Sequence, residues 1–225
     1  MIGTISWTMA DTPTLRDRTV EVLRDAILTQ HFKPGEKLAE RVLADETGVS
    51  RTSIREALSQ LQAEGLVQRV PGKGMFVTRV TAEEAQQIYE VRAIIEAATA
   101  RLFVARASDA DIDALEVAVN AAEAVNEPTS ALLHAQRLDA VSDIVMSGAG
   151  NDVARQMVAV LRARVTYLRT ITARSASRER RGETMAMLHR IVDAYRRRDA
   201  DLAEQLTRAY IERSAKFAQD VLHEA

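Results

Sequence analysis

Apolar residues recur along most of this chain every three or four positions, which is the period of an α-helix, and strand-like runs are confined to one short region. An apolar stripe over residues 15–27 ends before Pro34, because proline disfavours helix in the residue before it. From residue 81 onward, glycine, proline and asparagine separate helical patterns at 82–107, 109–125, 130–147, 151–173, 180–198 and 200–223. Thr81–Glu84 has the pattern of a capping box, and residues 81–225 are therefore predicted to form an antiparallel helical bundle.

Between residues 39 and 80 the pattern changes to two short helices and a hairpin. A helix at 39–46 is followed by a turn at Gly48 and by a second helix between Ser50, a suitable N-cap, and Gly65, a suitable stop. The runs 66–70 and 75–80 are rich in β-branched or bulky apolar residues, and a Pro-Gly-Lys-Gly turn separates them. This order predicts a helix-turn-helix with a two-stranded wing, so that the fold class is mainly α with an N-terminal winged helix-turn-helix.

Composition and charge narrow the range of functions. The whole chain has a net charge of −2, whereas residues 50–79 hold five cationic and two acidic side chains, a local net charge of +3. A positive surface on a mildly acidic protein is typical of phosphate contact. The chain has no cysteine, which excludes disulfides, thiolate metal sites and a cysteine nucleophile. Because no apolar run approaches about 18 residues, we expect a cytoplasmic protein without a membrane partner.

Catalytic motifs are missing from the sequence. The four histidines are scattered, and the sequence contains no H-E-x-x-H pair, Gly-rich phosphate loop or G-x-S-x-G elbow, so we expect neither an enzyme nor a cofactor. Two alternatives stay open: a winged helix whose helical domain is an enzyme or a protein-interaction scaffold, and a metal-dependent hydrolase built in the bundle. Four methionines at helical positions are expected to fill the core: Met146, Met157, Met185 and Met187.

Two segments resemble known families. The sequence KPGEKLAERVLADETGVSRTSIREALSQLQAEGLVQRVPGKGMFV resembles the winged helix-turn-helix of bacterial GntR-type transcription regulators, and this match covers about residues 15–80. Less closely, IYEVRAIIEAATARL at 88–102 resembles the first helix of the FCD-type effector domain in the FadR-like branch. The resemblance implies a repressor that binds double-stranded DNA at a palindromic operator as a homodimer, under the control of a small-molecule effector. The implied domains are a DNA-binding domain at 14–80 and an effector-binding and dimerisation domain at 81–225, after an aperiodic mobile tail at 1–13.

Candidate site residues follow from the two patterns. The helix that begins at Ser50 is expected to enter the major groove, and the glycine of the turn lets the wing approach DNA. The helix and wing provide the DNA contacts Ser50, Arg51, Arg55, Gly72 and Lys73, to which the resemblance adds Arg41, Thr52 and Ser53. The candidate effector contacts are Arg92, Asp139, Asp143, Asn151 and Tyr210. Within this set, Arg92 can form an ion pair with Glu96 or bind a ligand, and two carboxylates four residues apart can hold a cation or a proton.

Many relatives in the FadR-like branch hold a metal with an Asp, a His four residues later and two further His residues. Aligning on Asn151 without a gap puts Leu138 and Ser142 at the first two positions, whereas a shift of one residue puts Asp139 and Asp143 there. Aligning on Asp193 and Asp199 puts Leu188 and Tyr210 at the last two, and neither replaces an imidazole. We therefore predict no metal site of the family type, and a mostly apolar cavity between helices instead.

Overall fold

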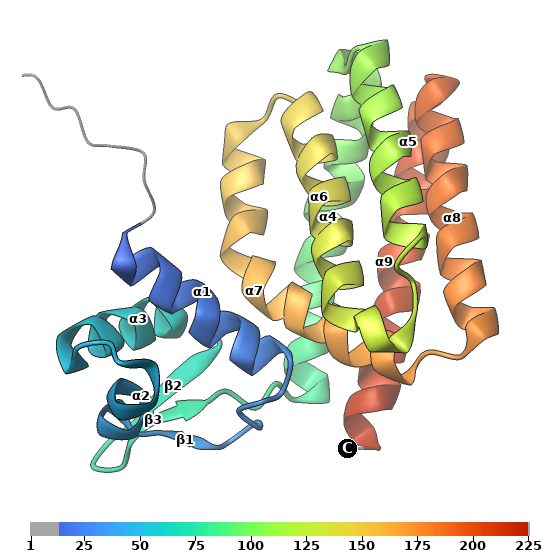
Figure 1. Cartoon of the computed structure of the whole chain (residues 1–225). Coiled ribbons are helices and arrows are strands. Elements are labelled where there is room, and N and C mark those ends of the chain that lie inside the picture. The colour runs from blue at the N-terminus through green and yellow to red at the C-terminus, as the bar shows by residue number, and fades with distance from the viewer. Residues whose placement is uncertain (1–13, 225) are drawn as a thin grey trace, which may run out of the picture.

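The computed structural model describes residues 14–224, so the predicted mobile tail lies outside the described residues. The described part is mainly α-helical with one small sheet, which confirms the predicted fold class (Figure 1). The elements in chain order are α1 (Leu15–Leu28), β1 (Lys37–Leu38), α2 (Glu40–Thr47), α3 (Arg51–Ala63), β2 (Val67–Val70), β3 (Gly74–Val77), α4 (Ala82–Arg106), α5 (Asp109–Glu123), η1 (Pro128–Ser130), α6 (Ala131–Gly148), α7 (Asp152–Ser175), α8 (Arg178–Arg196) and α9 (Ala200–His223). None of the helices in this part of the chain is long and apolar enough to cross a membrane.

The N-terminal head consists of α1 to α3 and the sheet. The apolar stripe of α3, which includes Ile54 and Leu61, is buried against α1 and β2. The sheet has three strands in the order β1-β3-β2, so it contains one more strand than the predicted wing. The extra strand exists because the chain after Pro34 runs antiparallel to β3, with Lys37 opposite Phe76. A backbone hydrogen bond from Gly35 N to Val77 O (2.9 Å) extends this pairing.

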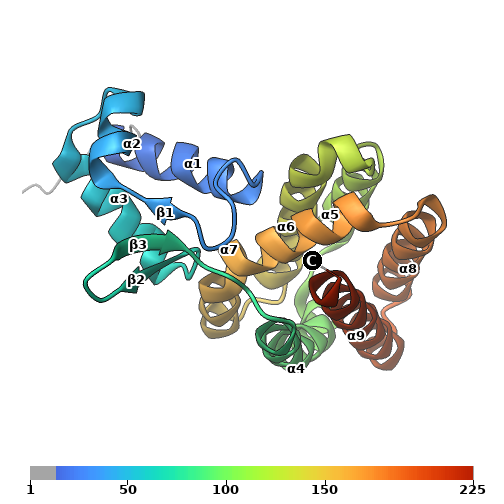
Figure 2. The ribbon, with the colours of Figure 1, turned by 90° about the horizontal axis from the view of Figure 1, so that it is seen from below.

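The helices α4 to α9 form the antiparallel bundle, in which α4 lies along α9 and α6 along α7. Figure 2 shows α9 between α4 and α8, and the β2–β3 hairpin points away from the bundle. One hydrophobic cluster is shared by the head, the first turns of α4, the second half of α7 and the last turns of α9. A second cluster fills the rest of the bundle. The head is thus packed on the bundle through side chains of α7.

Helix starts in the bundle are set by side chains that cap free backbone N–H groups. Thr81, Ser108, Asn151 and Asp199 accept hydrogen bonds from the first turns of α4, α5, α7 and α9. The start of α8 differs slightly from the prediction, which began this helix at residue 180. Helix α8 begins earlier, after the cap at Ser177, and runs through Gly182. A glycine inside a helix costs only about 1 kcal/mol relative to alanine, so a good cap nearby outweighs it.

Candidate nucleic-acid interface and ligand cavity

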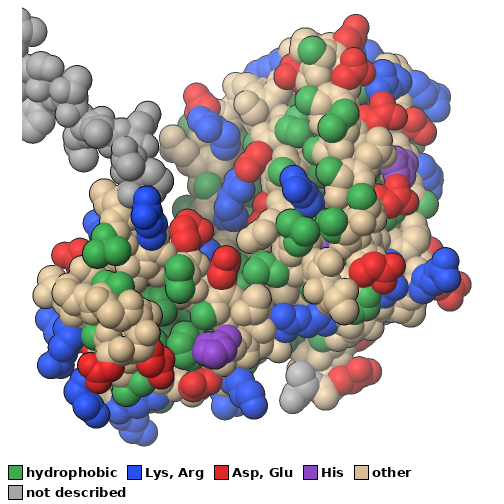
Figure 3. Space-filling model, in the orientation of Figure 1, with side chains coloured by type: hydrophobic (Ala, Val, Ile, Leu, Met, Phe, Trp, Pro, Cys, Tyr) green, Lys and Arg blue, Asp and Glu red, His purple; other side chains and the backbone are tan. Residues whose placement is uncertain are grey.

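The N-terminal turn of α3 is polar, cationic and exposed. The Ser50 hydroxyl accepts a hydrogen bond from the backbone N–H of Ser53 (3.2 Å) and so fixes the first turn of the helix. Arg51 and Thr52 follow it and are exposed. In Figure 3, lysine and arginine side chains gather along the outer, lower left edge of the head. Free N–H groups and positive charge at this end of α3 make it suitable for binding an anion.

Arg55 lies one turn further along α3 and is held by a carboxylate of α2. Its Nε and Nη2 donate hydrogen bonds to Glu40, with Nη2 at 2.8 Å from Oε2. These hydrogen bonds are the main reason why the pKa of Glu40 is lowered, and the positive charges of Arg51 and Arg69 lower it further. Arg41 on α2 is exposed, and its nearest acidic partner is Asp45 at 3.8 Å. The two helices therefore present exposed guanidinium groups, and the Glu40 carboxylate holds that of Arg55 in place.

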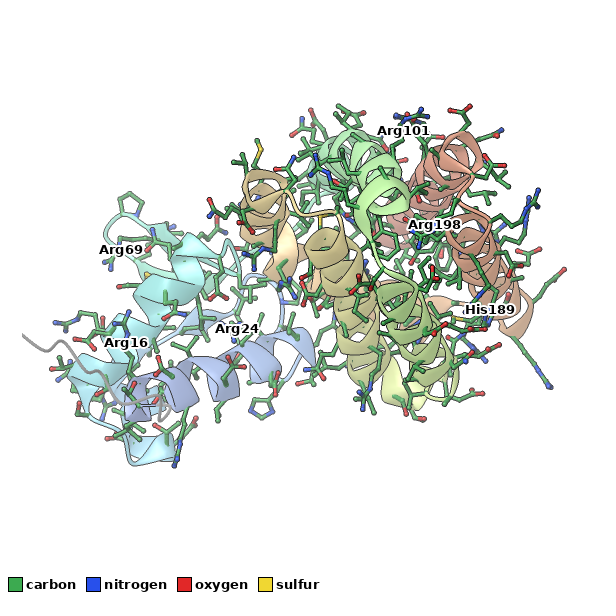
Figure 4. All side chains as sticks on the ribbon, turned by 90° about the horizontal axis from the view of Figure 1, so that it is seen from above. Arg16, Arg24, Arg69, Arg101, His189 and Arg198 are labelled. Atoms are coloured by element: carbon green, nitrogen blue, oxygen red, sulfur yellow. The ribbon has the colours of Figure 1, made fainter. Side chains whose placement is uncertain are left out.

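The hairpin between β2 and β3 provides the rest of this face. Gly72 has φ +70°, which favours glycine, and a Cβ there would meet nothing within 4 Å. Lys73 beside it is exposed. Figure 4 shows Arg69 of β2 at the outer part of the head, directed away from the bundle. Each of the eight sequence-predicted DNA contacts thus lies on α2, on the first turns of α3 or at the wing.

A cavity of about 70 Å³ lies between α4, α6, α7, α8 and α9. Arg92 and Tyr210, two of the candidate effector contacts, are in its wall. Arg92 is 2% exposed and donates hydrogen bonds to Glu96 from Nε (2.6 Å) and Nη2 (3.2 Å). The sequence left open whether this arginine forms an ion pair or faces a ligand. The structure shows the ion pair and also places Arg92 at the cavity.

Asp139 belongs to the same region but already has partners. Arg169 of α7 donates a hydrogen bond from Nη1 to Asp139 (2.5 Å), and the Thr166 hydroxyl donates another (2.6 Å). The side chains of Arg169 and Asp139 are only 8% and 13% exposed. Arg169 also donates from Nη2 to the Ser142 hydroxyl (3.3 Å). The carboxylate is therefore neutralised by a guanidinium of this chain.

The two other candidate effector contacts lie away from this cavity. Asp143 forms an ion pair with Arg162, and both side chains are more than two-fifths exposed. Asn151 caps α7 by accepting a hydrogen bond from Ala154 N–H (3.1 Å). Neither aspartate lines this cavity: Asp139 is buried beside it and pairs with Arg169, whereas Asp143, one turn further along α6, pairs with Arg162 near the surface.

Histidine and acidic residues do not gather into a metal site here. Within residues 14–224, no group of three or more His, Asp or Glu side chains is arranged to hold a metal ion. His134 lines the cavity, but its Nδ1 lies 2.9 Å from the carbonyl oxygen of Ala122. Burial lowers the pKa of His134, so that its neutral form, with Nδ1–H donating to that carbonyl, is favoured. His189 lies near the surface with Nε2 at 2.9 Å from Glu123.

Sequence reasoning missed three arginines of the cavity wall, namely Arg169, Arg180 and Arg181. Each sits on a helix that also carries many exposed arginines, so its charge alone does not distinguish it. A signal was present for Arg169, because it interrupts the buried run from Val165 to Ile171. A cation within a buried stripe needs a partner or a ligand.

Helix α7 joins this cavity to the head. Arg174 donates hydrogen bonds to the backbone oxygen of Thr29 (3.1 Å) and to Gln30 Oε1 (3.3 Å), just after α1. Arg164 pairs with Glu84 (3.1 Å) and lies so close to Gly65 that a Cβ there would be 2.3 Å from its Nε. The same helix thus touches the head on one face and carries Arg169 on another.

Comparison with known proteins gives two family matches. Residues 15–77 match the model described as bacterial regulatory proteins, gntR family, and residues 87–213 match the FCD domain. The Nta operon transcriptional regulator of Aminobacter aminovorans is 40% identical over 88 residues, which are 39% of this chain and 42% of that protein. The match thus spans less than half the length of that relative. YdhC of Bacillus subtilis, an HTH-type transcriptional regulator, is 24% identical over 204 residues, 90% of either chain. The structure of E. coli McbR/YncC has the same fold, with a TM-score of 0.75 at 17% identity over 93% of this chain and 99% of that one.

Proposed function

The chain belongs to the gntR family of bacterial regulatory proteins, with an FCD domain after its winged helix, and is a transcription regulator; we propose that it is a repressor whose operator binding is controlled by a small molecule. In this proposal residues 14–80 bind DNA, and residues 81–225 bind the effector and dimerise. The observation that carries it is the exposed cationic start of α3 beside a glycine-containing wing, on the side of the head that faces away from the bundle.

On DNA, the first turn of α3 enters the major groove, where Arg51 can reach base edges and Arg55 can reach bases or phosphates. Lys73 at the wing approaches the minor groove. The Glu40 carboxylate fixes the direction of the Arg55 guanidinium before DNA arrives. Ordering a long side chain in advance lowers the entropy lost on binding.

We further propose that the functional unit is a two-fold dimer joined through α4 and α7. Alternate spacings of four and three residues on α4 give an exposed heptad-like stripe: Gln87, Val91, Ile94, Ala98, Arg101 and Ala105. On α7, Val153, Met157 and Val160 are 67%, 56% and 63% exposed. The two helices adjoin, since Val91 of α4 and Leu161 of α7 line one groove.

Exposed apolar side chains that lie close together mark an interaction surface, so we expect a second copy of this chain to cover this face. In a two-fold dimer the same patch serves both partners, and two heads then read two half-sites of a palindrome. A single short helix cannot supply the specificity that a genome demands, whereas two half-sites can.

The DNA-binding part is tested by protection of the intergenic DNA next to the gene that encodes this protein. The double variant Arg51→Ala, Arg55→Ala is compared with Arg137→Ala, Arg190→Ala, which removes the same charge from exposed positions of the bundle. We expect the first to lose about 1 to 3 kcal/mol for each base-reading arginine and to lower the salt slope by about one for each phosphate contact. Equal operator binding by both double variants would refute the assignment.

The dimer is tested by sedimentation of the Ile94→Glu, Met157→Glu variant, free and with operator DNA. A buried glutamate on each partner would place like charges in the interface. We expect a monomer that binds the palindrome weakly but keeps its helical content. Val117, which is 68% exposed on α5, gives the control Val117→Glu, expected to remain dimeric. A wild-type monomer at micromolar concentration on and off DNA would contradict the proposal.

A further inference from the structure

The wall of the cavity of about 70 Å³ becomes more exposed towards one end of the bundle. At the inner end the wall consists of buried side chains, namely Tyr89, Arg92, His134, Leu138 and Arg169. At the outer end the lining residues are half-buried and come mainly from the end of α7, the first turns of α8 and the last turns of α9. This is the lower end of the bundle in Figure 1, where α8 begins and α9 ends. The way from solvent to the buried arginines therefore leads past the turn between α7 and α8.

Arg181 closes this end of the cavity through contacts with two other segments. Its Nη1 donates a hydrogen bond to the backbone oxygen of Ala176, just after α7 (2.7 Å), and its Nη2 pairs with Glu127 in the connection between α5 and α6 (3.3 Å). Its own backbone oxygen accepts a hydrogen bond from Asn126 Nδ2 (3.4 Å). The Arg181 side chain is 13% exposed but that of Glu127 is 68% exposed, so water and salt screen the ion pair.

The turn of α8 that carries Arg181 is a weak start for a helix. It holds three arginines, Arg178, Arg180 and Arg181, and one acidic residue, although the positive end of the helix dipole disfavours cations. Gly182 follows, and glycine loses more backbone entropy in a helix than alanine does. The Ser177 hydroxyl opposes these effects by accepting a hydrogen bond from the backbone N–H of Arg180 (3.2 Å). The first turn of α8 therefore opens at a lower free energy than the rest of the helix.

Arg180 in the same turn is held against α9 by a carbonyl oxygen and an aromatic ring. It donates a hydrogen bond to the backbone oxygen of Arg213 (3.0 Å), and its guanidinium carbon lies 3.9 Å from the centre of the Phe217 ring. Burial, followed by the nearby charge of Arg213, lowers the pKa of Arg180, because both disfavour its charged form. Movement of this side chain into water would relieve that cost.

We propose that the first turn of α8, residues 178–182, is a gate to the cavity, with Gly182 as its hinge and Arg181 as its latch. The gate opens when this turn unwinds and the Arg181 guanidinium leaves its two partners. The rest of α8, from Met185 onward, stays packed in the bundle. The inference rests on the proposed function, since it concerns how the small molecule reaches its site.

The first test measures opening of the turn by hydrogen exchange of the full-length protein, followed by mass spectrometry. The amide of Arg181 donates to the backbone oxygen of Ser177 (3.0 Å) and so reports on the turn. Gly182→Ala should raise the protection of amides 181–184 about two- to fivefold, because alanine favours the helix. A Cβ at Gly182 would meet no atom of the described residues within 4 Å, so the change causes no clash. Ala186→Gly, at an exposed position one turn further along, is the control and should leave this protection unchanged.

The second test measures access to the cavity with a single cysteine, since the chain has none of its own. Leu138→Cys places a thiol on the buried inner wall, and its rate of alkylation by iodoacetamide reports how often a small neutral molecule passes the gate. His134→Cys gives a second reporter on the same wall if the first variant does not fold.

In either reporter background, Gly182→Ala should slow alkylation by about the same two- to fivefold as hydrogen exchange. Arg181→Gln should speed alkylation about two- to tenfold, because it loses the hydrogen bond to Ala176 and the pair with Glu127. Arg190→Gln removes the same charge from an exposed position of α8 and should match the parent. Alkylation that neither Gly182→Ala nor Arg181→Gln changes, or that the control variants change equally, would overturn the gate.

Operator binding of the wild type is measured separately. If the gate variants change exchange and alkylation as expected and the wild type protects no DNA, the gate stands and the proposed function is wrong. If the wild type protects its operator and the gate variants leave both rates unchanged, the regulator function stands and the gate is wrong.

Discussion

Replacing Asp139 by alanine is expected to destabilise the bundle far more than replacing Asp143, although the two carboxylates are one turn apart on α6. Asp139 is paired with Arg169 in a region where both side chains are at most 13% exposed. Removing it leaves a buried guanidinium with only a neutral hydroxyl, that of Ser142, as its side-chain partner. Breaking a buried pair in this way typically costs about 3 to 5 kcal/mol.

The pair between Asp143 and Arg162 has the same chemistry in a different environment. These side chains are 48% and 42% exposed, so water and salt screen the attraction, and the expected loss is at most about 1 kcal/mol. For a chain of this size, 1 kcal/mol lowers Tm by about 2 to 4 °C. Asp139→Ala should therefore lower Tm by about 6 to 20 °C and Asp143→Ala by no more than about 4 °C.

The measurements are urea-induced unfolding for the free energy and thermal unfolding for Tm, both followed by circular dichroism, with protein concentration held constant because the proposed dimer would contribute to stability. A third variant, Asp139→Ala with Arg169→Met, removes both charges and should recover most of the loss, since an apolar side chain replaces the unpaired ion. Equal losses for Asp139→Ala and Asp143→Ala would refute the reasoning. A double variant no more stable than Asp139→Ala would show that lost packing, not the unpaired charge, causes the effect.

Three further predictions use other parts of the molecule. Gly65→Ala should cost more than Gly48→Ala in the same unfolding assay: both glycines have positive φ, but a Cβ at Gly65 would meet an arginine of α7, whereas one at Gly48 would meet nothing within 4 Å; equal costs would contradict this. Burial lowers the pKa of His134 below its unfolded value of about 6.5, so its contribution to stability is present above that pH and is lost as pH falls. Lowering the pH from about 7 to 5 should therefore reduce the free energy of unfolding of the wild type more than that of His134→Gln. Parallel plots of this free energy against pH for the two proteins would exclude the effect. Glu40→Gln should release the Arg55 guanidinium, tighten binding to non-specific DNA and narrow its difference from operator affinity in paired titrations, and an unchanged ratio would argue against the role of the carboxylate.

Much of the fold could be predicted from the sequence because its signals are local. Helix starts depend on capping residues such as Thr81, Ser108 and Asp199, whose hydrogen bonds are made within three residues. The third strand of the sheet was not predictable in this way. It has two residues, Lys37 and Leu38, and it exists only because the chain there meets β3.

Most of the cavity wall could not be predicted from local sequence signals. Arg92 and Tyr210 were found because they lie in segments that resemble the FCD domain, but the cavity wall takes its other charges from α7 and α8, and only the tertiary arrangement shows that these arginines meet. The exposure of individual apolar side chains could not be predicted from the sequence either. Met157 was expected in the core because of its helical position, and it is 56% exposed, since it shares the outward face of α7 with Val153 and Val160. Periodicity identifies a stripe but not what covers it.

The position of α7 explains how a ligand in the bundle can influence a head that it does not touch. Residues Arg164, Tyr167 and Arg174 share one stripe of the helix and lie at or near the head, whereas Arg169 and Thr172 lie on another stripe and face the cavity. A small molecule bound in this cavity would contact one face of α7, and the other face of the same helix holds the end of α1. The ligand changes operator affinity only as far as it binds one arrangement of α7 better than another, and typical couplings of about 1 to 3 kcal/mol correspond to changes of about 5- to 150-fold. By the same linkage, operator DNA must change ligand affinity by the same factor, so the two binding measurements constrain one quantity.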